Sequence, residues 1–126
     1  MAGFTPNLLI TLIAQSQNLK EITFNSAIDS LDEAMCSNKS ETMTDADFTI
    51  PAADFQLNGF IKFSGPLTAG RNVILPSGIS KWAIVVNNTG QILTFKNGTA
   101  TLTVAISDSN PHLLFSDGAG NVYKVS

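Results

Sequence analysis

A succession of short, apolar-rich segments separated by turn-forming residues restricts the fold of this chain more than any other feature. Segments of this length, with Gly, Asn, Asp and Pro between them, are typical of all-β proteins. The sequence therefore predicts a mainly β fold, an antiparallel β-sandwich of jelly-roll-like type preceded by an N-terminal helix. The expected strands lie at 47–50, 59–64, 71–75, 81–87, 91–96, 101–106, 112–116 and 121–125.

Two turns between these segments have clear local signals. Residues 87–90 read Asn-Asn-Thr-Gly and residues 97–98 read Asn-Gly. Both contain residues that tolerate a positive φ, which tight hairpin turns require. We therefore expect a β-hairpin at each position.

The apolar pattern along two strands predicts which side chains are buried. Residues 82–86 are apolar throughout, as in a strand covered on both faces by a second sheet or by another subunit. In the strand at 101–106, three residues alternate with Thr or Ala and are expected to point into the core. These residues are Leu102, Val104 and Ile106.

The chain divides into three parts. Residues 1–36 form an N-terminal attachment segment ending in a helix, 37–46 form a polar linker, and 47–126 form the β-sandwich domain. The helical pattern starts near Asn18, which is placed to cap the helix, with Glu21 completing a capping box.

Four large apolar residues recur in the helix at spacings of four, three and four, which places them along one stripe. They are Phe24, Ile28, Leu31 and Met35. One interpretation is a helix that packs on its own β-domain. The other is a short seam between chains, because the spacing fits the a and d positions of a heptad repeat. Such a seam is too short to be stable without contacts from the β-domains.

A mostly apolar run before the helix is the second candidate for docking. It is shorter than the ~20 residues of a membrane span and no basic region precedes it, so we expect neither a transmembrane helix nor a signal peptide. We expect it to dock into a core or a neighbouring subunit. Its large residues are Leu8, Leu9, Ile10, Leu12 and Ile13.

Charge and chemistry exclude several function classes. The net charge is −3 and Lys and Arg do not cluster, so nucleic acid is not an expected partner. His112 is the only histidine, and a lone His at a strand start is usually structural. Cys36 is the only cysteine, which excludes an intrachain disulfide and suits a reducing cytoplasm.

A metal site is also not expected. Cys36 and His112 have no companion ligands for zinc. Asp45 and Asp47 could offer two carboxylates to Ca²⁺, but the loop lacks the Gly and further oxygen ligands of a calcium loop. We expect no catalytic residues, no metal and no cofactor, and hence a protein that is not an enzyme.

Several motifs in the second half resemble a β-domain that recurs in tail fibres and related virion proteins of tailed phages. They are Arg-Asn-Val-Ile-Leu-Pro at 71–76, Trp-Ala-Ile-Val-Val-Asn-Asn-Thr-Gly at 82–90, Leu-Thr-Phe-Lys at 93–96 and Ser-Asp-Gly at 116–118. The resemblance covers roughly residues 55–126. The chain departs from the family at Ser116, where Cys is frequent, and at 119–120, which lengthen the last turn.

The N-terminal segment is similar to the start of many phage and prophage tail proteins of unknown biochemistry. The similarity lies in Thr-Pro-Asn-Leu-Leu at 5–9 and in residues 14–28, where Lys-Glu-Ile-Thr at 20–23 and Asn25 match best. Ala14 replaces the usual Gly, and Ser26 replaces the usual Glu.

These resemblances imply a non-enzymatic structural protein of a phage virion, assembled in the host cytoplasm. The expected form is a homotrimeric tail fibre or tail appendage component, which docks on tail or baseplate proteins by its N-terminal segment and displays its β-domain. The short chain favours an alternative, a capsid decoration (cement) protein that contacts the major capsid protein and stabilises the head shell.

A third alternative is a carbohydrate- or receptor-binding module for a host surface glycan. Its signature is an exposed platform of aromatic side chains. Trp82 and Tyr123 lie in strand-like patterns where we expect burial, whereas Phe55, Phe60 and Phe63 could form either a core or a patch.

Overall fold

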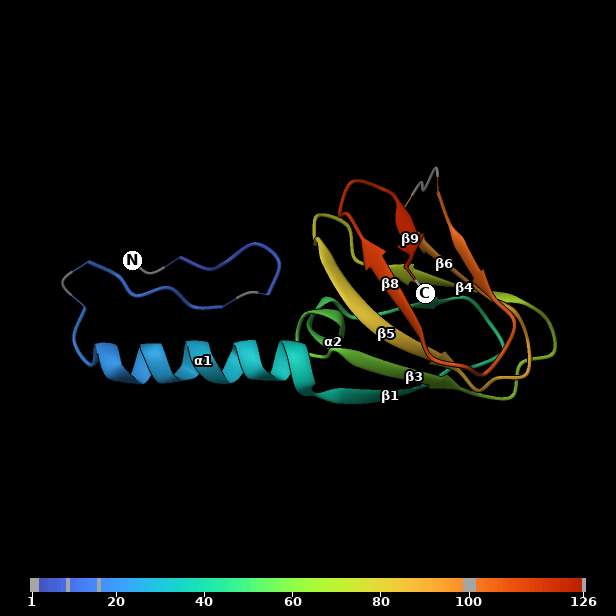
Figure 1. The fold of residues 1–126 in the computed structure, drawn as a ribbon, viewed down its shortest axis with the longest axis horizontal. Helices are drawn as coiled ribbons and strands as arrows, with labels where there is room; N and C mark the ends of the chain where they lie inside the picture. Colours follow the sequence, from blue (N-terminus) through green and yellow to red (C-terminus); the bar gives the residue numbers. More distant parts are fainter. Residues whose placement is uncertain (1–2, 9, 16, 99–101, 126) are drawn as a thin grey trace.

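The computed structural model describes residues 3–8, 10–15, 17–98 and 102–125. A long helix stands at one end of a two-layered β-domain (Figure 1). The helices are α1 (Lys20–Cys36) and α2 (Ala52–Gln56). The strands are β1 (Asn38–Thr42), β2 (Phe48–Thr49), β3 (Phe60–Ser64), β4 (Arg71–Leu75), β5 (Lys81–Asn87), β6 (Leu93–Asn97), β7 (Val104–Ile106), β8 (His112–Ser116) and β9 (Val122–Lys124).

The first six strands alternate between two sheets. One sheet has the order β1-β3-β5-β8-β9 and the other β2-β4-β6-β7. The pairs β1–β3, β3–β5, β2–β4 and β4–β6 are all parallel. The chain thus winds as a short two-sided solenoid, with roughly two dozen residues per turn. A sandwich with two sheets and an N-terminal helix is confirmed, but the prediction of an antiparallel arrangement is wrong for these four pairs.

The last three strands close the solenoid by antiparallel pairing. β7 pairs with β6, β8 pairs with β5, and β9 pairs with β8. The hairpin predicted at residues 97–98 exists as the antiparallel β6–β7 pair, but residues 99–101 of its connection lie outside the described residues, so the tight turn itself stays a prediction. The hairpin predicted at 87–90 does not exist, because β5 and β6 belong to different sheets.

Residues 87–90 instead form a corner between the sheets, held by one buried side chain. The Nδ2 group of Asn87 donates to the carbonyl oxygens of Gln91 at 2.7 Å and Ile106 at 2.9 Å. Its Oδ1 accepts from the N–H of Thr89 at 3.0 Å and from the Thr89 hydroxyl at 2.7 Å. This turn sequence therefore marks a corner rather than a hairpin.

The residues predicted as a polar linker, 37–46, contain β1, which forms an edge of the five-stranded sheet. We expected no strand there because the sequence is polar. Four of the five residues of β1 are exposed polar or charged side chains that need no core, and pairing with β3 satisfies the backbone groups that face into the sheet.

The core lies between the two sheets. The ring of Phe63 packs edge-on against Phe95, with centroids 5.5 Å apart, and against Phe48 at 6.4 Å. Val104 and Ile106 are buried as predicted. Leu102 is not: it precedes β7, forms an isolated bridge to Asn121 and is exposed.

Consecutive turns of the solenoid approach so closely that two positions require glycine. A Cβ on Gly59 would overlap the carbonyl of Met35, and a Cβ on Gly65 would overlap that of Met43. Gly65 also has φ of 146°, in the region that favours glycine. These contacts fix the end of α1 and the end of β1 against the next turn.

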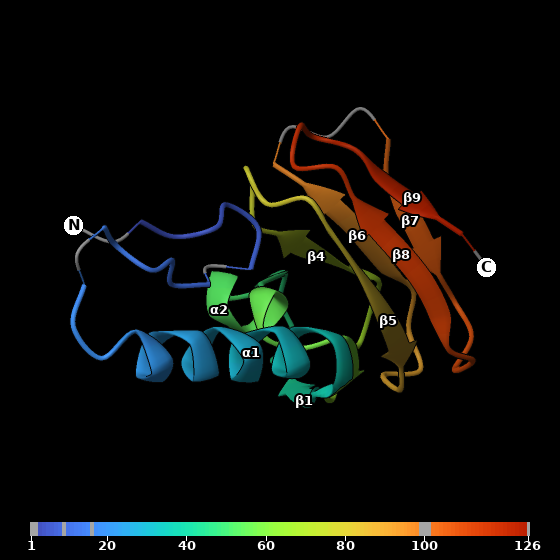
Figure 2. The ribbon, with the colours of Figure 1, turned by 60° about the vertical axis from the view of Figure 1, so that its left-hand side comes forward.

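The helix begins later than predicted. Leu19, not Asn18, is the N-cap; its φ is 55° and none of the described side chains caps the helix, so the expected capping box is absent. The described residues between 3 and 15 form an N-terminal loop, in which an antiparallel bridge joins Phe4 and Thr11. This loop lies along α1 in both views (Figures 1 and 2).

Candidate interaction surface

Helix α1 has two adjacent stripes of opposite character, and the apolar one faces away from the rest of the chain. The inner stripe consists of small or polar residues, all buried or half-buried: Thr23, Ala27, Ser30 and Ala34. The next residue in each case belongs to the predicted apolar stripe. Phe24, Ile28, Leu31 and Met35 are 56, 49, 39 and 54% exposed.

We call these four apolar residues the helix stripe. Its exposure contradicts the interpretation of α1 as an amphipathic helix packed on its own β-domain. A helix that turns small residues inward and large apolar residues outward leaves its hydrophobic surface exposed. The interpretation as a contact between chains stays a prediction.

The N-terminal docking candidates divide between inner and outer positions. Leu8 and Ile10 are half-buried, Leu12 and Ile13 are exposed, and Leu9 lies outside the described residues. The tip of the loop touches the β-domain, where Asn7 Oδ1 accepts a 2.6 Å hydrogen bond from the N–H of Ser80. The loop is thus tied to the domain as well as lying along α1.

A second apolar surface lies on the outer face of the five-stranded sheet. Trp82 of β5 pairs with Phe115 of β8, which pairs with Tyr123 of β9. Directly paired residues point to the same face of a sheet, so the three rings form one row. Trp82 and Tyr123 are 39 and 43% exposed, which contradicts their expected burial and the expectation that 82–86 are covered on both faces.

An aliphatic row runs beside the aromatic one. Ile84 pairs with Leu113, whose carbonyl accepts a 2.8 Å hydrogen bond from the N–H of Val125. Residues of both rows line a groove of about 400 Å³, and every lining side chain is apolar: Trp82, Ile84, Leu113, Phe115 and Val125. We call the two rows together the sheet face.

The sheet face carries little charge. Among the outward-pointing positions of the described strands of this sheet, Lys62 of β3 is the one charged residue, exposed between buried Ile61 and Phe63.

The sequence left open whether three phenylalanines belong to the core or to an exposed patch. Phe55 and Phe63 are buried in the core, and half-buried Phe60 pairs with Ile84 at the border of the sheet face.

A lysine lies buried just behind the aromatic row. Lys81 is 6% exposed, and its ammonium group donates to the carbonyl oxygens of Asn58 at 2.7 Å and Trp82 at 3.1 Å. The ammonium also lies 5.3 Å from the ring centroid of Phe55 and 5.6 Å from that of Trp82. Burial lowers the pKa of Lys81 to about 8.

A carboxyl group is buried in β1, at the other edge of the sheet. Glu41 is 6% exposed, and burial, followed by its hydrogen bond and repulsion with Asp54 of α2, raises the pKa of Glu41 to about 7. Glu41 and Lys81 lie on different strands and contact different partners, so their geometry does not form an acid–base pair.

The remaining polar candidates serve the fold. Asp45 accepts hydrogen bonds from Thr68 and Arg71, which together hold the pKa of its carboxyl at about 2, and Asp47 accepts from Asn72. These donors occupy the carboxylates considered for Ca²⁺.

No metal centre is formed by the described residues. His112 Nε2 lies 2.8 Å from Asp108 Oδ1, and this pair has no third ligand. Among the described residues, no three His, Cys, Asp or Glu side chains gather as a metal site would require.

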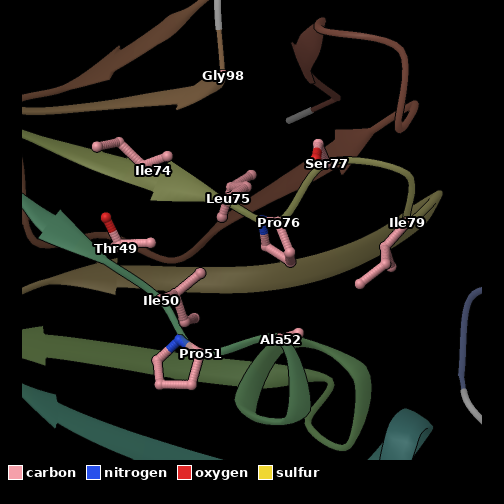
Figure 3. A pocket seen from close by; sticks show the side chains of 10 residues that line it. All are labelled: Thr49, Ile50, Pro51, Ala52, Ile74, Leu75, Pro76, Ser77, Ile79 and Gly98. Carbon is pink, nitrogen blue, oxygen red and sulfur yellow. The ribbon is translucent and has the colours of Figure 1, made fainter.

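A second hollow, of about 500 Å³, lies at the end of the sandwich beside α2 (Figure 3). Its walls are mostly apolar, and the hydroxyls of Thr49 and Ser77 are its polar side-chain groups. The lining side chains include no acid, base or metal ligand, so this hollow has no group that could transfer a proton in catalysis.

The helix stripe was predictable from the sequence, whereas the sheet face was not. A continuous apolar run at 82–86 does not show which residues point outward. The usable signal was the period of two in three separate strands, since residues 82 and 84, 113 and 115, and 123 and 125 each lie two apart.

Comparisons with protein-family models, curated proteins and solved structures found no match to this chain. Within the described residues, neither helix has the length and apolar character needed to cross a membrane.

Proposed function

We propose that this chain is a non-enzymatic structural protein of a tailed-phage virion, which assembles as a homotrimer through α1 and displays its β-domain. The observation that carries the proposal is the exposed helix stripe on a helix that stands clear of the sandwich (Figure 1). The motifs at 71–76, 82–90 and 20–23, which resemble phage tail proteins, supply the virion context.

The helix stripe supplies the driving force for assembly. Large apolar side chains carry ~200 Å² each, so the exposed fractions of the four leave ~400 Å² of apolar surface open. Removing such an area from water contributes about 10 kcal/mol per chain at about 25 cal/mol per Å², before the entropy of association is subtracted. The exposed Leu12 and Ile13 of the N-terminal loop are placed to contact the particle.

The oligomeric state tests the assembly step. Replacing Ile28 and Leu31 by Asp places two charges in the stripe, so we expect monomers of 13.4 kDa by light scattering where the wild type forms trimers. The matched control, Asn25→Asp with Ser26→Asp, adds the same charge at exposed positions outside the stripe and should stay trimeric. A trimeric I28D/L31D protein would exclude the helix stripe as the contact.

Immunogold electron microscopy of purified phage particles tests the virion role and separates two placements. Gold clustered at the tail is the result expected for a fibre or appendage component. Gold spread over the head, with copies in the hundreds, would instead favour the capsid decoration protein that the short chain suits. Particles without label would contradict both placements.

A second candidate function, binding of a host surface glycan, is favoured by one observation. Trp82, Phe115 and Tyr123 form a partly exposed aromatic row, which is the kind of platform that sugar rings stack on. Glycan-array binding that is lost on Trp82→Ala, with the fold intact by circular dichroism, would support this function.

A further inference from the structure

We propose that the sheet face is the docking site for the helix stripe of a second copy of this chain. This inference rests on the proposed assembly through α1 and names the surface that the helix stripe meets. The contact is heterologous: each chain offers its helix to one neighbour and its sheet face to the other, which closes a ring of three chains.

The position of the two surfaces requires a second copy. Helix α1 enters the five-stranded sheet at β1, one edge, whereas the sheet face lies on β5, β8 and β9 toward the other edge. Only Ser37 separates α1 from β1, and its N–H bonds to the carbonyl of Glu33 at 2.9 Å. From this junction α1 extends away from β8 and β9, so its stripe does not lie on the sheet face of its own chain (Figures 1 and 2).

The shape of the sheet face favours a convex partner. Its centre is a groove of about 400 Å³. Two sheet faces brought together by a two-fold axis would set groove against groove and leave both unfilled, at the cost of lost van der Waals contacts. A helix presents a ridge of side chains, and a ring such as Phe24 has the size to enter the groove.

The charges of the two surfaces also favour α1 as the partner of the sheet face. Helix α1 contains four acidic residues and Lys20 as its single basic one; the acids are Glu21, Asp29, Asp32 and Glu33. Three α1 helices packed side by side would bring these carboxylates together with little compensating charge. The sheet face instead has Lys62 as its neighbouring charged side chain, so the acidic helix meets a cation there.

The two surfaces are also matched in area. The sheet face exposes its apolar surface mainly through Trp82, Tyr123 and Val125, with contributions from the half-buried residues between them. This area is of the same order as that of the helix stripe. In a ring of three, each chain buries both surfaces, one against each neighbour, and the two together approach the roughly 800 Å² that one partner buries in a standard interface.

The all-apolar lining of the groove favours a protein ridge over a sugar. A glycan site needs hydrogen-bonding groups around its stacking ring, and the lining side chains offer no surface of this kind beyond the indole N–H of Trp82. A saccharide hydroxyl placed in this groove would lose its hydrogen bonds to water without replacement.

Trp82 is the only tryptophan of the chain, so its fluorescence reports directly on docking. In oligomeric wild type we expect a blue-shifted emission and a Stern–Volmer constant for acrylamide lowered about twofold, because an anchor inside an interface is shielded from water. The I28D/L31D helix variant should show an exposed Trp82 at every concentration. The N25D/S26D control should behave as wild type.

A complementation experiment then tests whether the helix stripe of another chain occupies the sheet face. The sheet variant Trp82→Glu/Val125→Glu keeps an intact helix stripe and contains no tryptophan, whereas the helix variant keeps an intact sheet face and its Trp82. Titrating the sheet variant into the helix variant should shift the Trp82 emission to the blue and saturate at one to one. Far-UV circular dichroism verifies that both variants are folded.

Three results would overturn the inference. One is a wild-type oligomer that I28D/L31D dissolves although acrylamide quenches Trp82 equally in both proteins, which indicates helices packed on helices and leaves the proposed assembly intact. Another is an I28D/L31D protein that stays oligomeric with Trp82 as well shielded as in wild type, which indicates contact between sheet faces and also contradicts assembly through α1. The third is shielding of Trp82 by oligosaccharides but not by the sheet variant. A wild type that stays monomeric and is missing from particles would remove the proposed function itself.

Discussion

Asn97 of β6 donates a 2.8 Å hydrogen bond from Nδ2 to the hydroxyl of Ser116 on β8, and this bond joins the two sheets through the interior. Both residues are 1% exposed. The same amide group also donates to the carbonyl of Pro76 at 3.2 Å. Ser116 thus supplies a partner for a buried amide.

Removing this bond should destabilise the domain. We expect Ser116→Ala to lower the free energy of unfolding by about 1 kcal/mol and Asn97→Ala by about 2–3 kcal/mol, since the latter also loses the bond to Pro76 and leaves a cavity. Urea unfolding of both single variants and the double variant measures the coupling. Strictly additive losses would show that the two side chains do not stabilise each other.

Lys81 should make the protein more stable as pH rises above 8. The pKa of Lys81 is about 8 in the folded state, against an ordinary value of 10.5, so the unfolded chain binds more protons between these values. Below pH 8 the buried ammonium penalises folding. We expect the free energy of unfolding to rise by about 2 kcal/mol from pH ~7 to ~9.5.

The control for this prediction is Lys81→Met, which preserves the aliphatic stem and removes the titrating group. Its free energy of unfolding should lack the rise between neutral and alkaline pH. An unchanged rise in the methionine variant would assign the pH dependence to another residue.

Glu41 should act in the opposite direction at lower pH. The pKa of Glu41 is raised from 4.5 to about 7, so the folded state binds the extra proton between these values and its stabilising contribution is lost as pH increases through 7. We expect a decrease of about 2 kcal/mol in the free energy of unfolding from pH ~5 to ~8. Together with the rise from Lys81, this predicts a stability minimum between the two pKa values, near pH ~7.5.

Glu41→Gln tests this effect, because glutamine resembles the protonated acid. The variant should be as stable as wild type at mildly acidic pH and more stable at mildly alkaline pH, as measured by thermal or urea unfolding at both. Equal stability of the two proteins at alkaline pH would contradict the assignment.

Gly59→Ala should destabilise the junction between α1 and the sandwich. The added methyl group would overlap the Met35 carbonyl, which is backbone and moves only with the end of the helix. We expect a loss of about 1–3 kcal/mol in urea unfolding, the usual cost of overpacking. Gly3→Ala is the matched control, since its Cβ would meet only Leu12 Cδ1 at 4.0 Å. A loss no larger than that of the control would mean that the junction yields freely.

The sequence predicted where most strands lie but not how they pair. The strands at 71–75 and 112–116 were predictable because each contains a short apolar run close to turn-forming residues, which is a local signal. The direction in which two strands pair depends on whether a hairpin or a crossover to the other sheet follows the first strand. Asn favours a tight turn in both cases, so Asn87 does not distinguish them. For this reason the parallel solenoid was not predicted.

Of the two apolar surfaces, the helix stripe was predicted from the sequence and the sheet face was not. The helix stripe was visible because Phe24, Ile28, Leu31 and Met35 follow one helical period. The outward orientation of the helix stripe could not be predicted. It is set by the inner stripe of α1, which ends at Ala34, and by the contact of α1 with Gly59. The aromatic row joins strands far apart in sequence, so it required the pairing of β5, β8 and β9.

The one-residue junction between α1 and β1 also determines how the molecule bears mechanical load. Only Ser37 joins the helix to the strand, so a pull on α1 is passed directly to the start of β1. A pull along the axis of β1 loads all the pairs from Asn38–Phe60 to Thr42–Ser64 in shear, whereas a pull across that axis opens them one after another, as in a peeled strand. An anchor built this way resists tension along the strand and yields far more readily to a sideways pull.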